Sequence, residues 1–139
     1  MASQELLSMM NQAISMEMQV SIQYMWQHVT WAGPVEYAVQ EEFKNLAITE
    51  MKHAELIAER LFFLGERPTV VPAPITVGMT LKEKIELDIQ AETTTIELYK
   101  KIKEKAAAEE DVTTMHIFTK ILQDEEEHLD FFTSLVQEF

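Results

Sequence analysis

Cysteine is absent from the 139-residue chain, and the conformational breakers are scarce, with three glycines and four prolines. The lack of cysteine excludes disulfides, thiolate metal ligands, iron–sulfur clusters and thiol nucleophiles. No apolar run is long enough to cross a bilayer, and the first residues lack the basic and apolar stretches of a signal peptide. We therefore expect a cytoplasmic protein.

Positive charge is also in short supply, because 11 basic side chains stand against 24 acidic ones and leave a formal charge of −13. Such a surface repels nucleic acids and anionic membranes, so we expect neither as a partner. The remaining composition, 47% hydrophobic and 25% charged, is typical of a globular protein. The length suits one domain with its own core, and we assign residues 1–139 to it.

The few breakers are concentrated at two places, the pair Gly33-Pro34 and the segment 65–78. The long runs between them carry apolar residues at intervals of three and four, which is the spacing of an amphipathic helix. The acidic stretch 109–111, followed by two threonines, indicates a further helix start. The sequence thus predicts four helices, at about 3–31, 35–64, 80–107 and 112–137.

The lengths of the connections predict how these helices are arranged. Short links after the first and third helices favour two antiparallel hairpins. The segment 65–79 can span about 50 Å when extended at about 3.3 Å per residue, whereas a helix of about 28 residues is about 42 Å long. We therefore predict an all-α four-helix bundle in which a long crossover loop joins the two hairpins.

Ionisable side chains interrupt the apolar faces of all four predicted helices: Glu17, Glu50, His53, Glu92, Glu125 and His128. The second and fourth helices each contain Glu-x-x-His, a spacing that places carboxylate and imidazole side by side. One such pair alone is common in acidic helices. Glu17 and Glu50 are 33 residues apart, as are Glu92 and Glu125, and Tyr24 and Tyr99 each follow the first glutamate by seven. This internal repeat predicts a pseudo-twofold site.

Four buried carboxylates without counter-charge would each cost several kcal/mol. Two divalent cations would neutralise them, and one histidine could complete each coordination sphere. Carboxylate and imidazole ligands suit iron or manganese, with zinc as a competitor. In the expected arrangement Glu50 and Glu125 bridge the two metals, while Glu17 and Glu92 bind one each. Two metals about 3.5–4 Å apart can bind dioxygen or peroxide between them and deliver two electrons.

The stretch Met16–Tyr24, the string Glu50-Met-Lys-His53 and the string Asp124-Glu-Glu-Glu-His128 resemble bacterioferritin, a family of the ferritin-like superfamily. The resemblance runs from about Leu7 to Val136. It implies a ferroxidase that oxidises Fe(II) with dioxygen or hydrogen peroxide at a di-iron centre, with Tyr24 beside the metal ligands. In the family, ferric mineral is stored inside a shell of twenty-four subunits.

Met51 stands where bacterioferritin has the methionine that binds haem at a twofold subunit interface. In this chain it lies in a stripe of small residues formed by Ala47, Ala54 and Ala58. One interpretation is a dimer interface that holds haem b between two Met51 side chains. The other is close packing of two subunits without haem. Both predict a homo-oligomer that is at least a dimer, with the twenty-four-subunit cage as the larger alternative.

The chain departs from the family at two points. It ends at Phe139, without the short fifth helix that lines the fourfold axes of the shell, and Asn45 and Thr49 stand where an inner-surface iron site needs His and Asp. The alternative function is therefore a non-storage di-iron or di-manganese oxidase, or a peroxide reductase, that works as a dimer. A metal-free helical interaction module is a third hypothesis, and the buried glutamates argue against it.

Other features of the sequence favour structural roles. We expect His28 to be hydrogen-bonded near the bundle end and His116 to be solvated. The methionines of the first helix are typical core and interface fillers. In the acidic run 124–127 we expect Glu125 alone to be a ligand.

Overall fold

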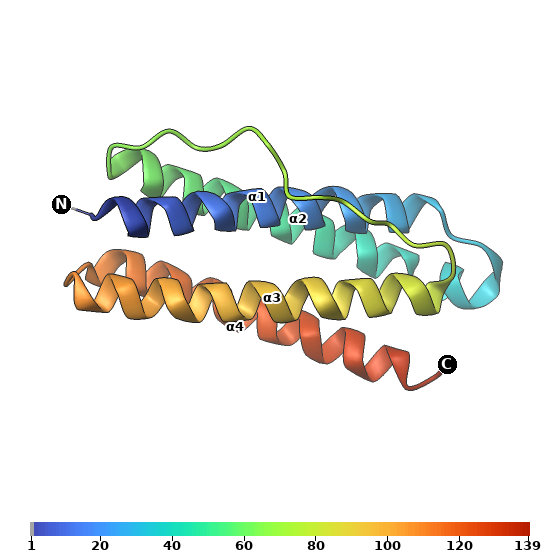
Figure 1. The fold of residues 1–139 in the computed structure, drawn as a ribbon. Helices are drawn as coiled ribbons and strands as arrows, with labels where there is room; N and C mark the ends of the chain where they lie inside the picture. The colour runs from blue at the N-terminus through green and yellow to red at the C-terminus, as the bar shows by residue number, and fades with distance from the viewer. Residues whose placement is uncertain (1) are drawn as a thin grey trace.

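The computed structural model describes residues 2–139 and contains four helices (Figure 1): α1 (Gln4–Val29), α2 (Gly33–Phe63), α3 (Leu81–Ala108) and α4 (Val112–Val136). No strand occurs in this part of the chain. The α1–α2 and α3–α4 pairs are antiparallel hairpins, and a long loop carries the chain from one end of the bundle to the other (Figure 1). The predicted all-α bundle with one crossover is confirmed.

The helix starts follow local capping chemistry. Ser3 accepts a hydrogen bond from the Leu6 amide, and Thr80 forms a reciprocal capping box with Glu83. The second helix begins at Gly33, two residues before the predicted start. The reason is that Pro34 is well suited to the first turn of a helix, so this pair opens α2 instead of preceding it.

The core consists of two apolar clusters, one toward each end of the bundle. Tyr99, Ile57 and Phe118 belong to the first cluster, and Tyr24 and Phe132 belong to the second. Along every helix the predicted metal ligand falls between the residues of one cluster and those of the other. The polar layer is thus enclosed by apolar side chains above and below it.

The crossover loop runs along α1 and is fixed there by side chains of that helix (Figure 1). Three donors on α1 bond to loop carbonyls: Asn11 to Arg67 at 3.1 Å, Ser15 to Val71 at 2.8 Å and Gln27 to Val77 at 2.9 Å. These bonds extend over four turns of the helix, so the loop covers the outer side of α1 for most of its length.

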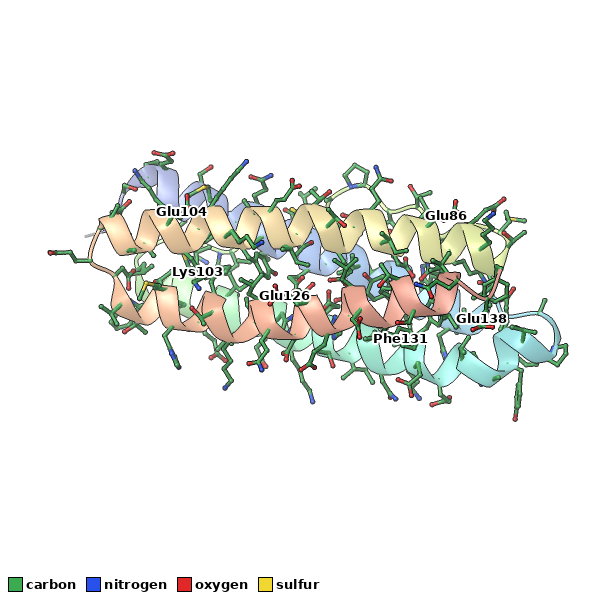
Figure 2. The ribbon with its side chains drawn as sticks, turned by 90° about the horizontal axis from the view of Figure 1, so that it is seen from below. Glu86, Lys103, Glu104, Glu126, Phe131 and Glu138 are labelled. Atoms are coloured by element: carbon green, nitrogen blue, oxygen red, sulfur yellow. The ribbon has the colours of Figure 1, made fainter. Side chains whose placement is uncertain are left out.

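No helix in the described residues is both long and apolar enough to cross a membrane. Viewed with α3 and α4 in front, the bundle carries acidic side chains on its outer faces, among them Glu86, Glu104 and Glu126 (Figure 2). Most of the acidic side chains therefore lie on the surface, and most of the exceptions form the polar layer in the middle of the bundle.

Candidate metal centre

The structure brings all six predicted ligands together in the middle of the bundle. Each of the four glutamates is fully buried, and His53 and His128 are 4% and 8% exposed. They form two groups whose ligand atoms lie within 4.8 Å of one another: Glu17, Glu50, His53 and Glu125 in one, and Glu50, Glu92, Glu125 and His128 in the other. Because Glu50 and Glu125 belong to both groups, they have the position of bridging ligands.

The first group is compact around His53. The Nδ1 atom of His53 lies 2.9 Å from Glu17 Oε2, 2.8 Å from Glu125 Oε1 and 3.1 Å from Glu50 Oε1. The other ring nitrogen, Nε2, lies 2.8 Å from Asp124 Oδ2. Nδ1 therefore faces the carboxylates of the centre, and Nε2 faces outward to a carboxylate on α4.

The second group is more open. The Nδ1 atom of His128 lies 3.3 Å from Glu50 Oε1, 3.7 Å from Glu92 Oε1 and 3.9 Å from Glu125 Oε1. The two imidazole rings are nearly parallel, with centroids 6.3 Å apart and an interplanar angle of 20°. The histidines thus flank the shared carboxylates as a matched pair, one for each metal position.

Electrostatics make this cluster costly without metal. Burial raises the pKa of Glu50, Glu92 and Glu125 well above the ordinary glutamate value, and repulsion from neighbouring carboxylates adds to the effect. Burial alone would lower the pKa of His53, but its contacts with Glu125, Glu17 and Glu50 raise it strongly. In the absence of metal, burial and mutual repulsion thus favour the protonated form of these carboxyls, and the carboxylate contacts favour the protonated form of His53.

The donor set fits two divalent cations. Seven buried atoms of the ligands have no hydrogen-bond partner: Glu17 Oε1, both oxygens of Glu50, Glu92 Oε2, both oxygens of Glu125 and His128 Nδ1. Buried polar atoms are nearly always satisfied, so a concentration of orphaned oxygens calls for cations. Hard oxygen donors with one imidazole on each side match iron, manganese or zinc.

The two repeat-related tyrosines both lie next to the centre but make different contacts. The Tyr24 hydroxyl donates a 2.6 Å hydrogen bond to Glu92 Oε1. The Tyr99 hydroxyl is buried and makes no hydrogen bond, although the Glu17 carboxylate contributes, after burial, to raising its pKa. Tyr24 therefore contacts a carboxylate of the opposite hairpin, whereas Tyr99 forms no such bond.

The sequence predicts Asp124 only as part of a solvated acidic run, but the structure places it against a histidine of the centre. The side chain of Asp124 is 45% exposed, yet it accepts from the buried Nε2 of His53. The sequence carries no signal for this contact, because the contact depends on how closely α2 approaches α4.

A buried polar group near the α1–α2 turn was also missed. Asp88 is fully buried and accepts hydrogen bonds from Gln23 at 2.9 Å and Gln27 at 2.8 Å. Lys84, one turn earlier, is 1% exposed and forms a 2.9 Å ion pair with Glu36. Asp88 lies four residues before Glu92 on the same face of α3, a spacing that could have marked it as inward-facing.

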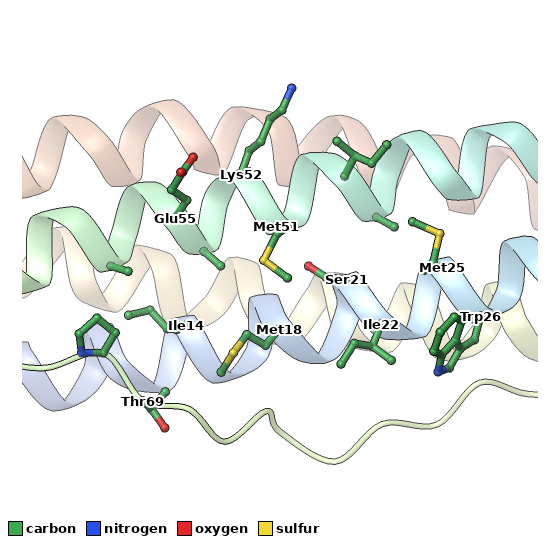
Figure 3. A pocket seen from close by; sticks show the side chains of 15 residues that line it. Ile14, Met18, Ser21, Ile22, Met25, Trp26, Met51, Lys52, Glu55 and Thr69 are labelled. Carbon is green, nitrogen blue, oxygen red and sulfur yellow. The ribbon is translucent and has the colours of Figure 1, made fainter.

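The predicted haem residue, Met51, lies in an apolar groove of about 690 Å³ between the outer sides of α1 and α2 (Figure 3). Its side chain is 49% exposed and points from α2 toward Met18 and Ser21 on α1 (Figure 3). Ala47 and Ala54 form part of the groove wall. The groove is on a different side of α2 from Glu50, so it is separate from the metal centre.

The two remaining histidines lie outside the centre. His28 Nδ1 is 2.7 Å from the carbonyl oxygen of Gln40, near the α1–α2 turn, and His116 is exposed on α4. Both observations agree with the structural roles expected for them.

Comparisons with known proteins agree with this geometry. Residues 7–139 match a family model described as the ferritin-like domain. A bacterioferritin of Desulfovibrio desulfuricans is 30% identical over 132 residues, covering 94% of this chain and 74% of the relative. One of Rhodobacter capsulatus is 28% identical over 129 residues, covering 91% and 80%. A solved ferritin-like, diiron-carboxylate protein from Bacillus anthracis superimposes with a TM-score of 0.92 and 26% identity, covering 95% of both chains.

Proposed function

Because the chain belongs to the ferritin-like family, we propose that it is a ferroxidase, which oxidises ferrous iron at a centre of two metal ions within one subunit. The observation that carries the proposal is the pair of ligand groups that share Glu50 and Glu125. Five of the six buried side chains have polar atoms without a hydrogen-bond partner, and such a cluster has no comparable use in a purely structural bundle.

The six side chains would divide their roles according to their positions. Glu50 and Glu125 would bridge the metals, Glu17 and His53 would complete one site, and Glu92 and His128 would complete the other. Oxidation of two ferrous ions to ferric ions supplies two electrons, which together with two protons from solvent reduce dioxygen to hydrogen peroxide, or hydrogen peroxide to two molecules of water. Manganese or zinc could occupy the same ligands. Tyr24, bonded to Glu92, would hold that carboxylate in place.

We also propose that the chain works as a homo-oligomer, with the groove around Met51 at a twofold contact. The groove is lined mainly by apolar side chains, and its alanines allow a second helix to approach closely. A second copy would bring its own Met51 to the same contact, which could hold haem b between the two sulfur atoms. Haem titration of the purified protein, with a Met51→Leu control, tests this assignment through the Soret absorption.

Iron storage in a large shell is proposed as the physiological role, and a dimeric oxidase or peroxide reductase is the alternative. The decisive experiment is ferrous titration of metal-stripped protein with oxygen uptake, combined with particle mass on the same sample. Rapid oxidation that saturates at two irons per chain, followed by slower uptake of many more in a large particle, supports storage. Saturation at two irons in a dimer supports the alternative, and the absence of a rapid phase overturns the ferroxidase.

A further inference from the structure

The two halves of the metal centre are related by a constant shift in the sequence. Each residue of the first hairpin has a counterpart 75 residues later, as 125 − 50, 128 − 53 and 92 − 17 all show. The same shift relates Tyr24 to Tyr99. Departures from this correspondence are therefore places where one metal position differs from the other, and they can be read directly from the contacts.

The largest departure concerns the outer nitrogen of each histidine. His53 Nε2 lies 2.8 Å from the carboxylate of Asp124, the residue immediately before Glu125. The counterpart of Asp124 is Thr49, immediately before Glu50. Among the described residues, no carboxylate other than the shared and terminal ligands lies within 4.0 Å of His128. One histidine thus has an anionic partner, and the other has none.

A carboxylate behind a metal-binding histidine fixes the ring orientation and increases the basicity of the ligating nitrogen. At His53 this leaves Nδ1 to face the metal position, because Nε2–H donates to Asp124. It also adds one negative charge beside that half of the centre. Threonine at position 49 has a neutral, short side chain and supplies neither effect to His128.

The remaining contacts do not compensate for this difference. The His53 half is compact, with Nδ1 2.8–3.1 Å from three carboxylates, whereas His128 Nδ1 is 3.3–3.9 Å from its three. The other half does have an outer partner in Tyr24, but a phenol bonded to Glu92 is neutral and adds no charge. The charge of Asp124, the fixed orientation of the His53 ring and the shorter distances all favour tighter metal binding at the His53 position.

From these contacts we infer that the two metal positions are unequal, and that Asp124 makes the position at His53 bind a divalent cation more tightly than the position at His128. This inference rests on the proposed dimetal function. Asp124 is a positioning residue here, since it acts on the metal through the imidazole of His53. Loss of such a partner typically weakens metal binding about 10–100-fold.

Zinc tests the inference without redox chemistry. We expect calorimetric titration of the metal-free protein to give two binding steps whose dissociation constants differ about 10-fold or more. Crystals grown with one equivalent of zinc per chain should show stronger anomalous density beside His53 than beside His128. Equal density at the two positions, or stronger density beside His128, would overturn the inference.

Two substitutions should each narrow the difference in affinity, one by weakening the tighter position and the other by strengthening the weaker one. Asp124→Asn should weaken the tighter step about 10-fold or more and leave the weaker step unchanged. Thr49→Asp should strengthen the weaker step and bring the anomalous density beside His128 closer to that beside His53. The matched control is Glu126→Gln, which removes one exposed carboxylate from the same turn of α4 without touching His53. If Glu126→Gln weakens zinc binding as much as Asp124→Asn does, the effect comes from net charge alone and the contact with His53 has no role.

The outcomes separate this inference from the function on which it rests. Two zinc ions bound with equal affinities would overturn the inequality and leave the dimetal centre intact. A wild-type protein that binds no zinc would overturn both.

Discussion

The hydroxyl of Tyr24 on α1 donates a 2.6 Å hydrogen bond to the carboxylate of Glu92 on α3, and so joins the two hairpins at the metal centre. Both residues are fully buried, so water does not compete for this bond. The sequence repeat relates Tyr24 to Tyr99, whose hydroxyl makes no hydrogen bond. Substitution of Tyr99 is therefore a matched control for substitution of Tyr24.

We expect Tyr24→Phe to slow ferrous oxidation about 10-fold, because partners of metal ligands typically contribute 10–100-fold to affinity or activity. Stopped-flow absorbance after mixing metal-free protein with ferrous iron in air measures the rate. Tyr99→Phe removes a hydroxyl without a partner and should leave the rate nearly unchanged. Equal slowing in both variants would show that the hydrogen bond to Glu92 is not the cause.

Removal of a bridging carboxylate should abolish rapid ferrous oxidation without lowering the stability of the metal-free protein. Glu50→Ala takes away a ligand that both metal positions share, and rapid ferrous oxidation should fall at least 100-fold. The metal-free variant should be as stable as the wild type or more stable, because it loses a buried carboxylate with no hydrogen-bond partner. Stopped-flow absorbance and urea unfolding give the two quantities, and Glu55→Ala on the exposed side of α2 is the control. Parent-rate oxidation by Glu50→Ala would contradict the assigned site.

A lower pH should stabilise the metal-free protein and weaken the binding of zinc. Glu50, Glu92 and Glu125 have pKa values raised by burial and by neighbouring carboxylates, so they stabilise the metal-free fold below the ordinary glutamate pKa, and this contribution is lost as the pH rises through the raised values. The free energy of unfolding of metal-free protein should therefore fall as the pH rises above the ordinary glutamate pKa.

Zinc must displace those protons, so its affinity should increase over the same pH range. At 100 times its dissociation constant zinc stabilises the fold by about 2.7 kcal/mol. Urea unfolding with and without zinc, together with calorimetry in buffers of different ionisation enthalpy, measures the stability and the protons released. Zinc affinity that does not change from pH 5 to pH 8 would contradict the protonated state of the ligands.

The fold and the gathering of the six candidate ligands could be predicted from the sequence because their signals are periodic. The breakers at 33–34 mark the turn of the first hairpin, those at 65–78 mark its end, and apolar spacing gives the helical faces. The six ligands follow from a repeat within those faces. The register of each helix then places its ligand between the two apolar clusters, as the structure has it.

Asp124 and Asp88 could not be identified in the same way, because their roles depend on pairing between helices. Asp124 has the sequence context of a solvated acid, and only the approach of α2 brings His53 to within 2.8 Å of it. Asp88 is tolerated in the core because two glutamines from α1 reach it. Single-helix periodicity carries no information on such contacts, whereas it carries most of the information on burial.

Asp88 provides a pH-dependent test of this buried polar group. Burial raises the pKa of Asp88 to about 7, against the opposing influence of Gln23, Gln27 and Lys84. Because the folded-state pKa lies above the unfolded one, Asp88 stabilises the fold most at pH values below its ordinary pKa, and the contribution is lost as the pH rises toward 7. Each pH unit within this window corresponds to at most about 1.4 kcal/mol.

Asp88→Asn should abolish this dependence while keeping an oxygen that accepts from Gln23 and Gln27. We expect the stability of the variant to exceed that of the wild type by a margin that grows from pH 5 to pH 8, as measured by urea unfolding of metal-free protein at both values. The difference between variant and wild type isolates Asp88, since the ligand carboxylates titrate equally in both proteins. A loss of stability of the same size at pH 5 and pH 8 would instead mean that Asp88 is ionised throughout and that its charge, balanced by Lys84, supports the fold.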